Sequence, residues 1–357
     1  MKIGSMQTKL IEVPLGKGRG GSGATSVEMI MVECRTKDGI TGTGFSYALT
    51  GGGSAIKALI DDTLQGLVLD TDILQWDRVW HQLYQRTHRL GRGVSLPAIS
   101  AIDIAMWDIK GKVAGLPLYQ LLGQQQEKVL VYGSGRANHQ MTTEELIEGA
   151  LVYKEEGYSS IKLRAGALGL EEDVRRIKAV KQEIGEMRIM VDCNERLNYE
   201  EALWLGQQLQ DLDVFWMEEP LISENVTGHK KLAEKLNMPI AVGEHLHGRF
   251  EFVNYIENNS ASIFQPDCPL VGGISEWKRI ATIAEGFGLS ISPHFLPELH
   301  IHLAASTTNC ISIEHFPLID DVLEETLTIK NGYGVLPEAA GHSIKWDAEK
   351  IDYYQKL

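Results

Sequence analysis

Three carboxylic acids stand at equal intervals in the second half of the chain, each directly after a short apolar run. They are Asp192 in IMVDCNE, Glu218 in VFWMEEP and Glu244 in IAVGEHL, separated by 26 residues each. That interval is about one strand and helix unit, so we expect the three side chains at the carboxyl ends of successive parallel strands. Three converging anions require a cation, and oxygen-only ligands on rigid strand ends favour Mg²⁺, which keeps positions open for water or substrate.

Other ionisable residues also stand where apolar runs end. The run SSIKLRA ends with Lys162 and Arg164, and later runs end at Asp267, His294 and Glu314. Residues two apart in a strand share a face, so both cations are expected to point into the same opening as the carboxylates. The sequence therefore predicts a site with two cations, three metal-binding carboxylates and a pair formed by an acid and a histidine.

The strands and helices that position these residues are predicted from the alternation of residue types after Lys128. Short apolar runs alternate with amphipathic stretches such as EEDVRRIKAVKQEIG and EWKRIATIAEGFG. Eight strands with intervening helices and no large break in composition favour a (β/α) barrel over an open doubly wound sheet. The eight runs are KVLVYGS, SSIKLRA, MRIMVDCN, DVFWMEE, PIAVGEH, ASIFQPD, LSISPHF and CISIEHF.

The first part of the chain has a different pattern of apolar and polar residues. The segments MIMVECRTKDG and GTGFSYA predict a hairpin that turns at Asp38 and Gly39, and apolar residues spaced by three and four predict helices from about Ser54 to Leu67 and over PAISAIDIAMWDIKGKVAG. These elements indicate an α+β domain. We therefore divide the chain into a capping domain over 1–125, a barrel domain over 126–320, and a C-terminal segment over 321–357.

Composition limits the possible partners and surroundings. A chain of 357 residues exceeds the usual single core, and its net charge of −14 argues against nucleic acid or an anionic membrane as partner. No N-terminal signal region and no apolar stretch long enough to span a membrane is present. The four cysteines have no CxxC spacing, so reduced thiols in a cytoplasmic protein are the simplest interpretation.

The ordered motifs resemble those of the enolase superfamily, in particular its mandelate racemase-like subgroup. The similar motifs are Lys-x-Arg, Asp-x-Asn, Glu-Glu-Pro, Gly-Glu-His, Pro-Asp, Pro-His and Ile-Glu-His, and AISAIDIAMWDIKGKVAGLPLYQLLG resembles the N-domain signature. The similarity covers essentially the whole chain. It implies a modified (β/α)₇β TIM-type barrel, an α+β cap, a C-terminal segment that returns to the cap, and Mg²⁺-assisted removal of the proton α to a carboxylate.

The resemblance also implies a role for each site residue. Asp192, Glu218 and Glu244 would hold Mg²⁺, which stabilises the charge that develops on the substrate carboxylate. His294 would be the base, with Asp267 fixing its tautomer. Glu314 would donate a hydrogen bond to the substrate carboxylate, which requires a protonated side chain, so we expect burial and neighbouring anions to raise its pKa.

Arg164 departs from the pattern of the racemising members, which have a lysine there. A guanidinium does not release its proton at accessible pH, so only His294 is a clear base, and a one-face reaction is favoured. The expected reaction is dehydration of an acid sugar, an aldonate or aldarate, to a 2-keto-3-deoxy acid. The alternatives are a racemase, epimerase or lactone cycloisomerase, Lys162 as the base, and a non-catalytic carboxylate-binding homologue.

Substrate recognition is expected at loops of the cap that close over the barrel. Glycine-rich segments near 15–24 and 47–53 match such lids, and Lys17 or Arg19 would meet distal groups of a small carboxylate substrate. Asn194 and His245 adjoin metal ligands and are further candidates. The GxGxG at 16–20 opens no helix and does not predict a dinucleotide site, and His300 and His302 are expected in a helix. The family also implies a homo-oligomer.

Overall fold

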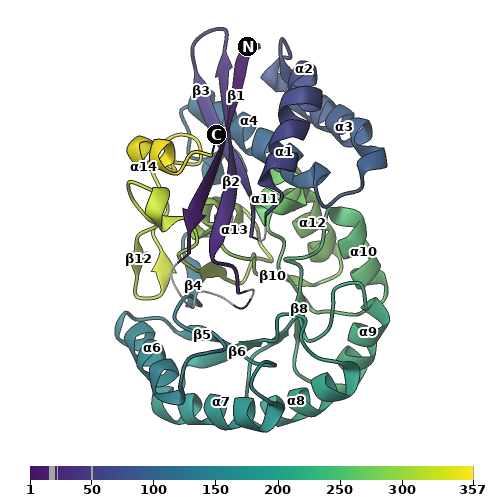
Figure 1. The fold of residues 1–357 in the computed structure, drawn as a ribbon, viewed down its shortest axis with the longest axis vertical. Coiled ribbons are helices and arrows are strands. Elements are labelled where there is room, and N and C mark those ends of the chain that lie inside the picture. Colours follow the sequence, from purple (N-terminus) through teal and green to yellow (C-terminus); the bar gives the residue numbers. More distant parts are fainter. Residues whose placement is uncertain (16–20, 22, 50, 357) are drawn as a thin grey trace.

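The computed structural model describes residues 1–15, 21, 23–49 and 51–356. Figure 1 shows a sheet with helices at the N-terminal end of the chain, standing over a ring of strands and helices formed by the later residues. The first sheet contains β1 (Ile3–Pro14), β2 (Ser26–Thr36) and β3 (Thr41–Ala48), all antiparallel. The expected hairpin is β2 and β3, and Gly39 at its turn has a positive φ of 92°.

The capping domain contains two elements that the sequence patterns did not reveal. Strand β1 has an irregular alternation of buried and exposed residues, and its pairing with β2 shifts register between Ile3 and Ser5. Helix α3 (Trp76–Arg86) was also not predicted. The helical segment expected from Ser54 is present as α1 (Gly53–Leu59), a π-helical turn (Ile60–Leu64) and α2 (Gln65–Val68).

Helix α4 (Ser95–Ala114) packs across β3 because two glycines face it. A Cβ on Gly42 would lie 2.5 Å from the carbonyl oxygen of Ala105, and one on Gly44 would also collide with the helix backbone. This close approach explains why β3 has the sequence GTGF. It fixes β3 on the helix that also packs against α11 (Cys268–Val271) and α12 (Gly273–Gly286) of the barrel.

All eight predicted apolar runs form parallel strands of one barrel-like sheet. The order is β4 to β10, and β11 pairs with β4, while a single bridge between Ile291 and Cys310 connects β10 to the segment before β11. The predicted fold class is confirmed. The strands are β4 (Val129–Gly133), β5 (Ser160–Arg164), β6 (Arg188–Asp192), β7 (Met217–Glu218), β8 (Ile240–Val242), β9 (Ile263–Phe264), β10 (Ser290–Ile291) and β11 (Ile313–His315).

Helices connect successive strands on the outside of the ring (Figure 1). Two of them begin with a capping box, at Thr142 with Glu145 and at Asn198 with Glu201. His300 and His302 lie in a helix as expected, and both are buried. The connecting helices are α6 (Thr143–Glu155), α7 (Leu170–Ile184), α8 (Tyr199–Asp211), α9 (Val226–Lys235), α10 (Arg249–Glu257), α11, α12 and α13 (Pro297–Ala305), while α5 (Leu118–Leu121) precedes β4 and α14 (Ala348–Tyr353) lies beside the cap (Figure 1).

The C-terminal segment crosses from the barrel to the cap. A hairpin of β12 (Ile329–Lys330) and β13 (Tyr333–Gly334) pairs with β4, and later the backbone amide of Lys356 donates to the carbonyl of Leu10 at 2.8 Å. Among the described helices, none combines the length and the apolar character that a bilayer span needs. The domain boundaries at 125 and 320, the homo-oligomer and the cytoplasmic location stay predictions.

Candidate active site

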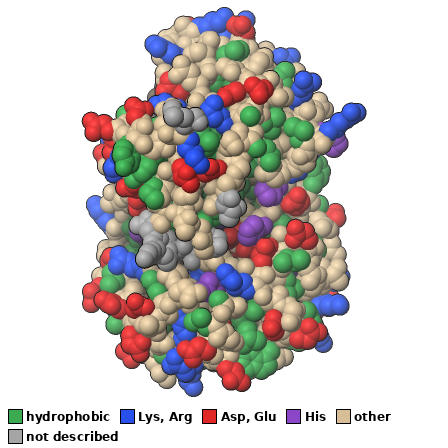
Figure 2. Space-filling model, in the orientation of Figure 1, with side chains coloured by type: hydrophobic (Ala, Val, Ile, Leu, Met, Phe, Trp, Pro, Cys, Tyr) green, Lys and Arg blue, Asp and Glu red, His purple; other side chains and the backbone are tan. Residues whose placement is uncertain are grey.

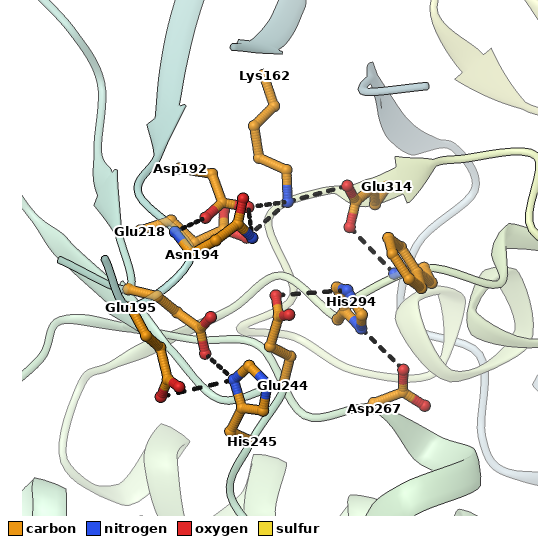
Figure 3. Close-up of polar contacts among 12 residues, drawn as sticks. Lys162, Asp192, Asn194, Glu195, Glu218, Glu244, His245, Asp267, His294 and Glu314 are labelled. Atoms are coloured by element: carbon orange, nitrogen blue, oxygen red, sulfur yellow. Dashed lines mark hydrogen bonds and ion pairs between the residues drawn. The ribbon is translucent and has the colours of Figure 1, made fainter. Parts of the chain in front are cut away.

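The register of the parallel strands brings the predicted carboxylates together. In the strand register, Arg164 is opposite Asp192 and Asp192 is opposite Glu218, so these residues lie at the same level of the sheet although they are far apart in sequence. One oxygen each of Asp192, Glu218 and Glu244 lies within 4.8 Å of the others. Figure 3 shows these side chains converging from neighbouring strand ends toward one point. The spacing and the all-oxygen donor set fit a hard divalent cation.

The negative charge of an ionised Glu244 is not balanced by its described protein neighbours. Its Oε2 atom has no hydrogen-bond partner among the described residues, and His294 Nε2 lies 3.4 Å away. Burial raises the pKa of Glu244 well above its usual value, and the nearby charges of Glu219 and Asp192 raise it further. A cation bound among the three carboxylates would relieve this repulsion.

Lys162 lies at the centre of the buried charges. Its ammonium is 2.6 Å from Glu218, 2.9 Å from Glu314 and 3.5 Å from Asp192. Burial alone lowers the pKa of Lys162, but the surrounding carboxylates outweigh it and raise the pKa well above its usual value. Lys162 is therefore an ammonium ion here, and this state does not favour its alternative role as a base.

Two hydrogen-bond acceptors hold Arg164 beside Lys162. The guanidinium donates to Asp192 and, at 3.2 Å, to Asn194 Oδ1. Burial lowers the pKa of Arg164, but the charge of Asp192 and other carboxylates raises it above the ordinary value. Arg164 is a permanent cation, which agrees with its expected electrostatic role.

His294 faces this cluster from the other side of the barrel mouth. Its Nδ1 is 2.9 Å from Asp267 Oδ2, so the network assigns the proton to Nδ1 and leaves Nε2 as the basic nitrogen, directed toward Glu244. Burial, together with the charges of Lys162, His245 and Arg164, lowers the pKa of His294 well below its usual value. The imidazole is neutral at neutral pH, as a base requires.

Tyr47 of β3 completes this arrangement, although the sequence patterns did not single it out. Its hydroxyl donates to Asp267 Oδ2 at 2.5 Å, and the side chain is buried. The hydrogen bond connects a cap strand to the residue that orients His294. The only sequence signal is that Tyr47 lies near the end of an apolar run, shortly before the glycines at 51–53.

The expectation for Glu314 was wrong in one respect. Burial raises the pKa of Glu314, but Lys162 and Arg164 outweigh it, so the pKa lies below the usual value and the side chain is ionised. Its second oxygen accepts from the backbone amide of Phe295 at 3.1 Å. The strand order brings Lys162 and Arg164 near Glu314, which the sequence did not reveal. The ionised Glu314 side chain has no proton to donate to a substrate.

Asn194 lies beside the carboxylates, as expected from its phase with Asp192. It has a positive φ of 46°, and its Nδ2 donates to Asp192 at 3.3 Å. His139, from the loop after β4, is a further residue that the sequence did not reveal: its Nε2 lies 3.2 Å from Asn194 Oδ1. Burial and the charges of Arg196 and Arg164 lower the pKa of His139 to about 4.

The candidate His245 belongs to a second cluster directly behind the three carboxylates. Its Nδ1 is 2.8 Å from Glu219 and 3.6 Å from Glu195 (Figure 3). Each member follows one of the three carboxylate-bearing strands, and Glu195 and Glu219 have positive φ angles of 60° and 40° that direct them to this point. We call Glu195, Glu219 and His245 the rear cluster. Its ion pairs connect the three loops that carry the candidate ligands.

We expect His245→Asn to weaken Mg²⁺ binding by about 10- to 100-fold, as loss of a supporting residue behind a metal ligand commonly does. Asparagine removes the ion pairs with Glu219 and Glu195, so the loops bearing Glu218 and Glu244 are less constrained. Titration of Mg²⁺ by calorimetry measures the change. The matched control is His81→Asn, since His81 is exposed on α3. Unchanged affinity in the His245 variant would show that the rear cluster does not position the ligands.

The lid candidates Lys17 and Arg19 lie outside the described residues. Next to that stretch, the carbonyl of Gly21 accepts a hydrogen bond from Arg196 at 3.0 Å. Any side chain at position 21 would collide with Asn194. The chain at Gly21, within the segment expected to form a lid, therefore passes directly over the barrel mouth.

Comparison with known families agrees with this geometry. Residues 145–351 match the family described as enolase C-terminal domain-like, and residues 14–123 match the mandelate racemase/muconate lactonizing enzyme N-terminal domain. The chain belongs to this family. The suspected relationship to the mandelate racemase/muconate lactonizing enzyme family of the enolase superfamily is confirmed along both domains.

Individual members of the family are similar over most of their length. L-talarate/galactarate dehydratase of Salmonella typhimurium is 36% identical over 86% of this chain and 78% of its own. The 3,6-anhydro-alpha-L-galactonate cycloisomerase of Streptomyces coelicolor is 31% identical over 91% and 90%. The structure of the Salmonella dehydratase with Mg and L-lyxarohydroxamate superposes with a TM-score of 0.95, covering 100% of this chain and 93% of that one at 32% identity.

Proposed function

We propose that this member of the mandelate racemase/muconate lactonizing enzyme family is a Mg²⁺-dependent acid sugar dehydratase that forms a 2-keto-3-deoxy acid. The observation that carries the proposal is the asymmetry of the site. A neutral imidazole oriented by Asp267 stands on one side, and two fixed cations, Lys162 and Arg164, stand on the other. One side can accept a proton, and the other stabilises negative charge.

The chain's own residues account for each proton transfer. Mg²⁺ held by Asp192, Glu218 and Glu244 would stabilise the negative charge of the enediolate. His294 Nε2 takes the α-proton, while Nδ1 keeps its hydrogen bond to Asp267, which stabilises the imidazolium. The imidazolium then protonates the β-hydroxyl, the C–O bond breaks, water leaves, and the enol becomes the 2-keto acid.

A second candidate is lactone cycloisomerisation, which the similarity to the D-galactarolactone cycloisomerase of Agrobacterium fabrum supports. It shares the removal of the α-proton but expels a ring oxygen instead of water, so the product is an isomer of the substrate. Racemisation is less favoured because it needs a proton donor and acceptor on both faces, and Arg164 does not exchange a proton at accessible pH.

The test is a panel of acid sugars and their anhydro or lactone forms, incubated with Mg²⁺ in D₂O. We expect a 2-keto-3-deoxy acid from at least one aldonate or aldarate, detected by a keto-acid assay and by NMR. Keto acid formed only from an anhydro or lactone form, as an isomer of the substrate and without loss of water, would assign the cycloisomerase reaction instead. Solvent deuterium at the α-carbon without either product, on every compound, would contradict the dehydratase proposal.

A further inference from the structure

A second, larger cavity opens beside the reacting groups. It has a volume of about 310 Å³ and lies between the cap and the rim of the barrel, and we call it the outer chamber. A much smaller cavity of about 30 Å³ lies over Arg164 and Asn194. Glu244, His294 and Leu49 line both cavities. The candidate metal ligand and base therefore stand at the junction between them.

This arrangement gives a substrate one direction in which to extend. The small cavity is lined by Arg164, which attracts a carboxylate, but it is too small for a whole sugar acid. The outer chamber is large enough for the remaining carbons, since ligand pockets typically measure about 300 Å³ or more. Figure 2 shows histidine and acidic side chains together at mid-height of the molecule, on the face between cap and barrel.

The cap side of the outer chamber is apolar. Its described lining consists of glycines and of apolar side chains, among them Ile56, Val94 and Pro97, together with Tyr47. Leu270 adds an apolar side chain from the barrel. The hydroxyl of Tyr47 is already used by Asp267. The described part of this wall offers no charged group to a ligand.

The polar groups of the barrel side are also engaged or of the wrong sign. His245 is held in ion pairs with two carboxylates, 2.8 Å from Glu219 and 3.6 Å from Glu195, and Glu244 adds a further carboxyl group to this wall. Burial and the charge of His245 lower the pKa of His247, so this imidazole is neutral. No lysine or arginine belongs to the described lining of the outer chamber. Among the described residues, the one cation at this wall, His245, is already paired with two carboxylates, so a second substrate carboxylate placed there would be desolvated without a free counter-ion.

We propose that the outer chamber binds the end of the substrate remote from the reacting carboxylate, and that it selects an uncharged end. The substrate is then a monocarboxylic acid sugar of the aldonate type, with a CH₂OH or CH₃ terminus, and not a dicarboxylic aldarate. This inference rests on the proposed function, because it takes the carboxylate next to Lys162 and Arg164 as the reacting end.

The test compares matched sets of three acids that differ only at the terminal carbon, which is CH₃, CH₂OH or COO⁻. Several stereochemical series are used, and the comparison is made within each. We expect kcat/KM for the dicarboxylate to be lower than for both monocarboxylates by at least about tenfold. A dicarboxylate that reacts as well as its monocarboxylates would overturn the proposal.

A protein variant with a new cation in the outer chamber tests the same preference for an uncharged substrate end. Val94 is 39% exposed, so Val94→Lys introduces an ammonium at the wall without opening the core. It should raise the ratio of dicarboxylate to monocarboxylate kcat/KM by about tenfold. Leu74→Lys adds the same charge at an 85% exposed position elsewhere on the cap and should leave that ratio unchanged. An equal change in both variants would refute a local effect.

Measurements of substrate affinity test the outer chamber proposal independently of the proposed reaction. Calorimetry of the same acids with Mg²⁺ and the His294→Asn protein measures affinity without turnover. If no acid reacts with the natural protein but the monocarboxylates still bind more tightly, the dehydratase proposal fails and the outer chamber proposal stands. If the dicarboxylates bind as tightly or more tightly, the outer chamber proposal fails whatever the reaction.

Discussion

We expect the His294→Asn variant to lose at least about a thousandfold in kcat, within the range that a positioned general base contributes. Asparagine fills similar space and keeps a donor toward Asp267, but it cannot accept the α-proton. Exchange of that proton with D₂O should disappear together with product formation. The affinity for Mg²⁺ should stay within a few-fold of the natural protein, because His294 is not among the three clustered carboxylates.

The pH dependence gives this prediction a second readout. The pKa of His294 is lowered well below its usual value, so the imidazole stays neutral through the neutral range and gains a proton only in acid. The acid limb of kcat/KM should therefore lie below pH about 6.5, the ordinary pKa of histidine. His81→Asn, on the exposed face of α3, is the control and should keep both rate and profile. Retained α-proton exchange in His294→Asn would assign the base to Lys162.

The second large effect is expected from Glu244→Gln, which should weaken Mg²⁺ binding by more than about 100-fold and abolish turnover at ordinary Mg²⁺ concentrations. Glu244 is the most informative of the three carboxylates to change. Asp192 and Glu218 are bonded to Arg164 and Lys162, so neutralising either one leaves a buried cation short of a partner. Glu244 has no lysine or arginine partner among the described residues, so its replacement leaves no buried cation unpaired.

Thermal melting distinguishes lost metal binding from misfolding. Without Mg²⁺, Glu244→Gln should melt at or above the temperature of the natural protein, because it removes a carboxyl group whose ionisation is disfavoured by burial and by the charges of Glu219 and Asp192. Added Mg²⁺ should raise the melting temperature of the natural protein but not of the variant. Glu257→Gln, an exposed change on α10, should behave as the natural protein. A Glu244 variant that still gains stability from Mg²⁺ would exclude Glu244 as a ligand.

The barrel could be predicted from sequence because its strands are buried on both faces and appear as short apolar runs. Each run ends with its polar residue, and the parallel register turns that position in sequence into a position in space. Asp192, Glu218 and His294 were found in this way. Strand β1 was missed because its alternation is irregular, and the boundaries of short strands carry little signal of their own.

Features that depend on contacts between distant segments were not accessible to the sequence. Tyr47 meets Asp267 across 220 positions of chain, and His139 meets Asn194 across 55. The charge state of Glu314 depends on how near Lys162 and Arg164 lie, which the motif order does not specify. The sequence identified the ionisable groups, but their pKa values follow from three-dimensional distances.

The hydrogen bond from Tyr47 to Asp267 makes catalytic activity depend on docking of the cap onto the barrel. Asp267 and His294 belong to the barrel, while Tyr47 belongs to the cap, and Gly42 and Gly44 hold its strand against α4. A barrel that folded before the cap docked would possess every candidate metal ligand and yet lack a fully oriented base. Activity would then report correct assembly of the two domains, and a half-assembled chain would bind metal without consuming metabolites.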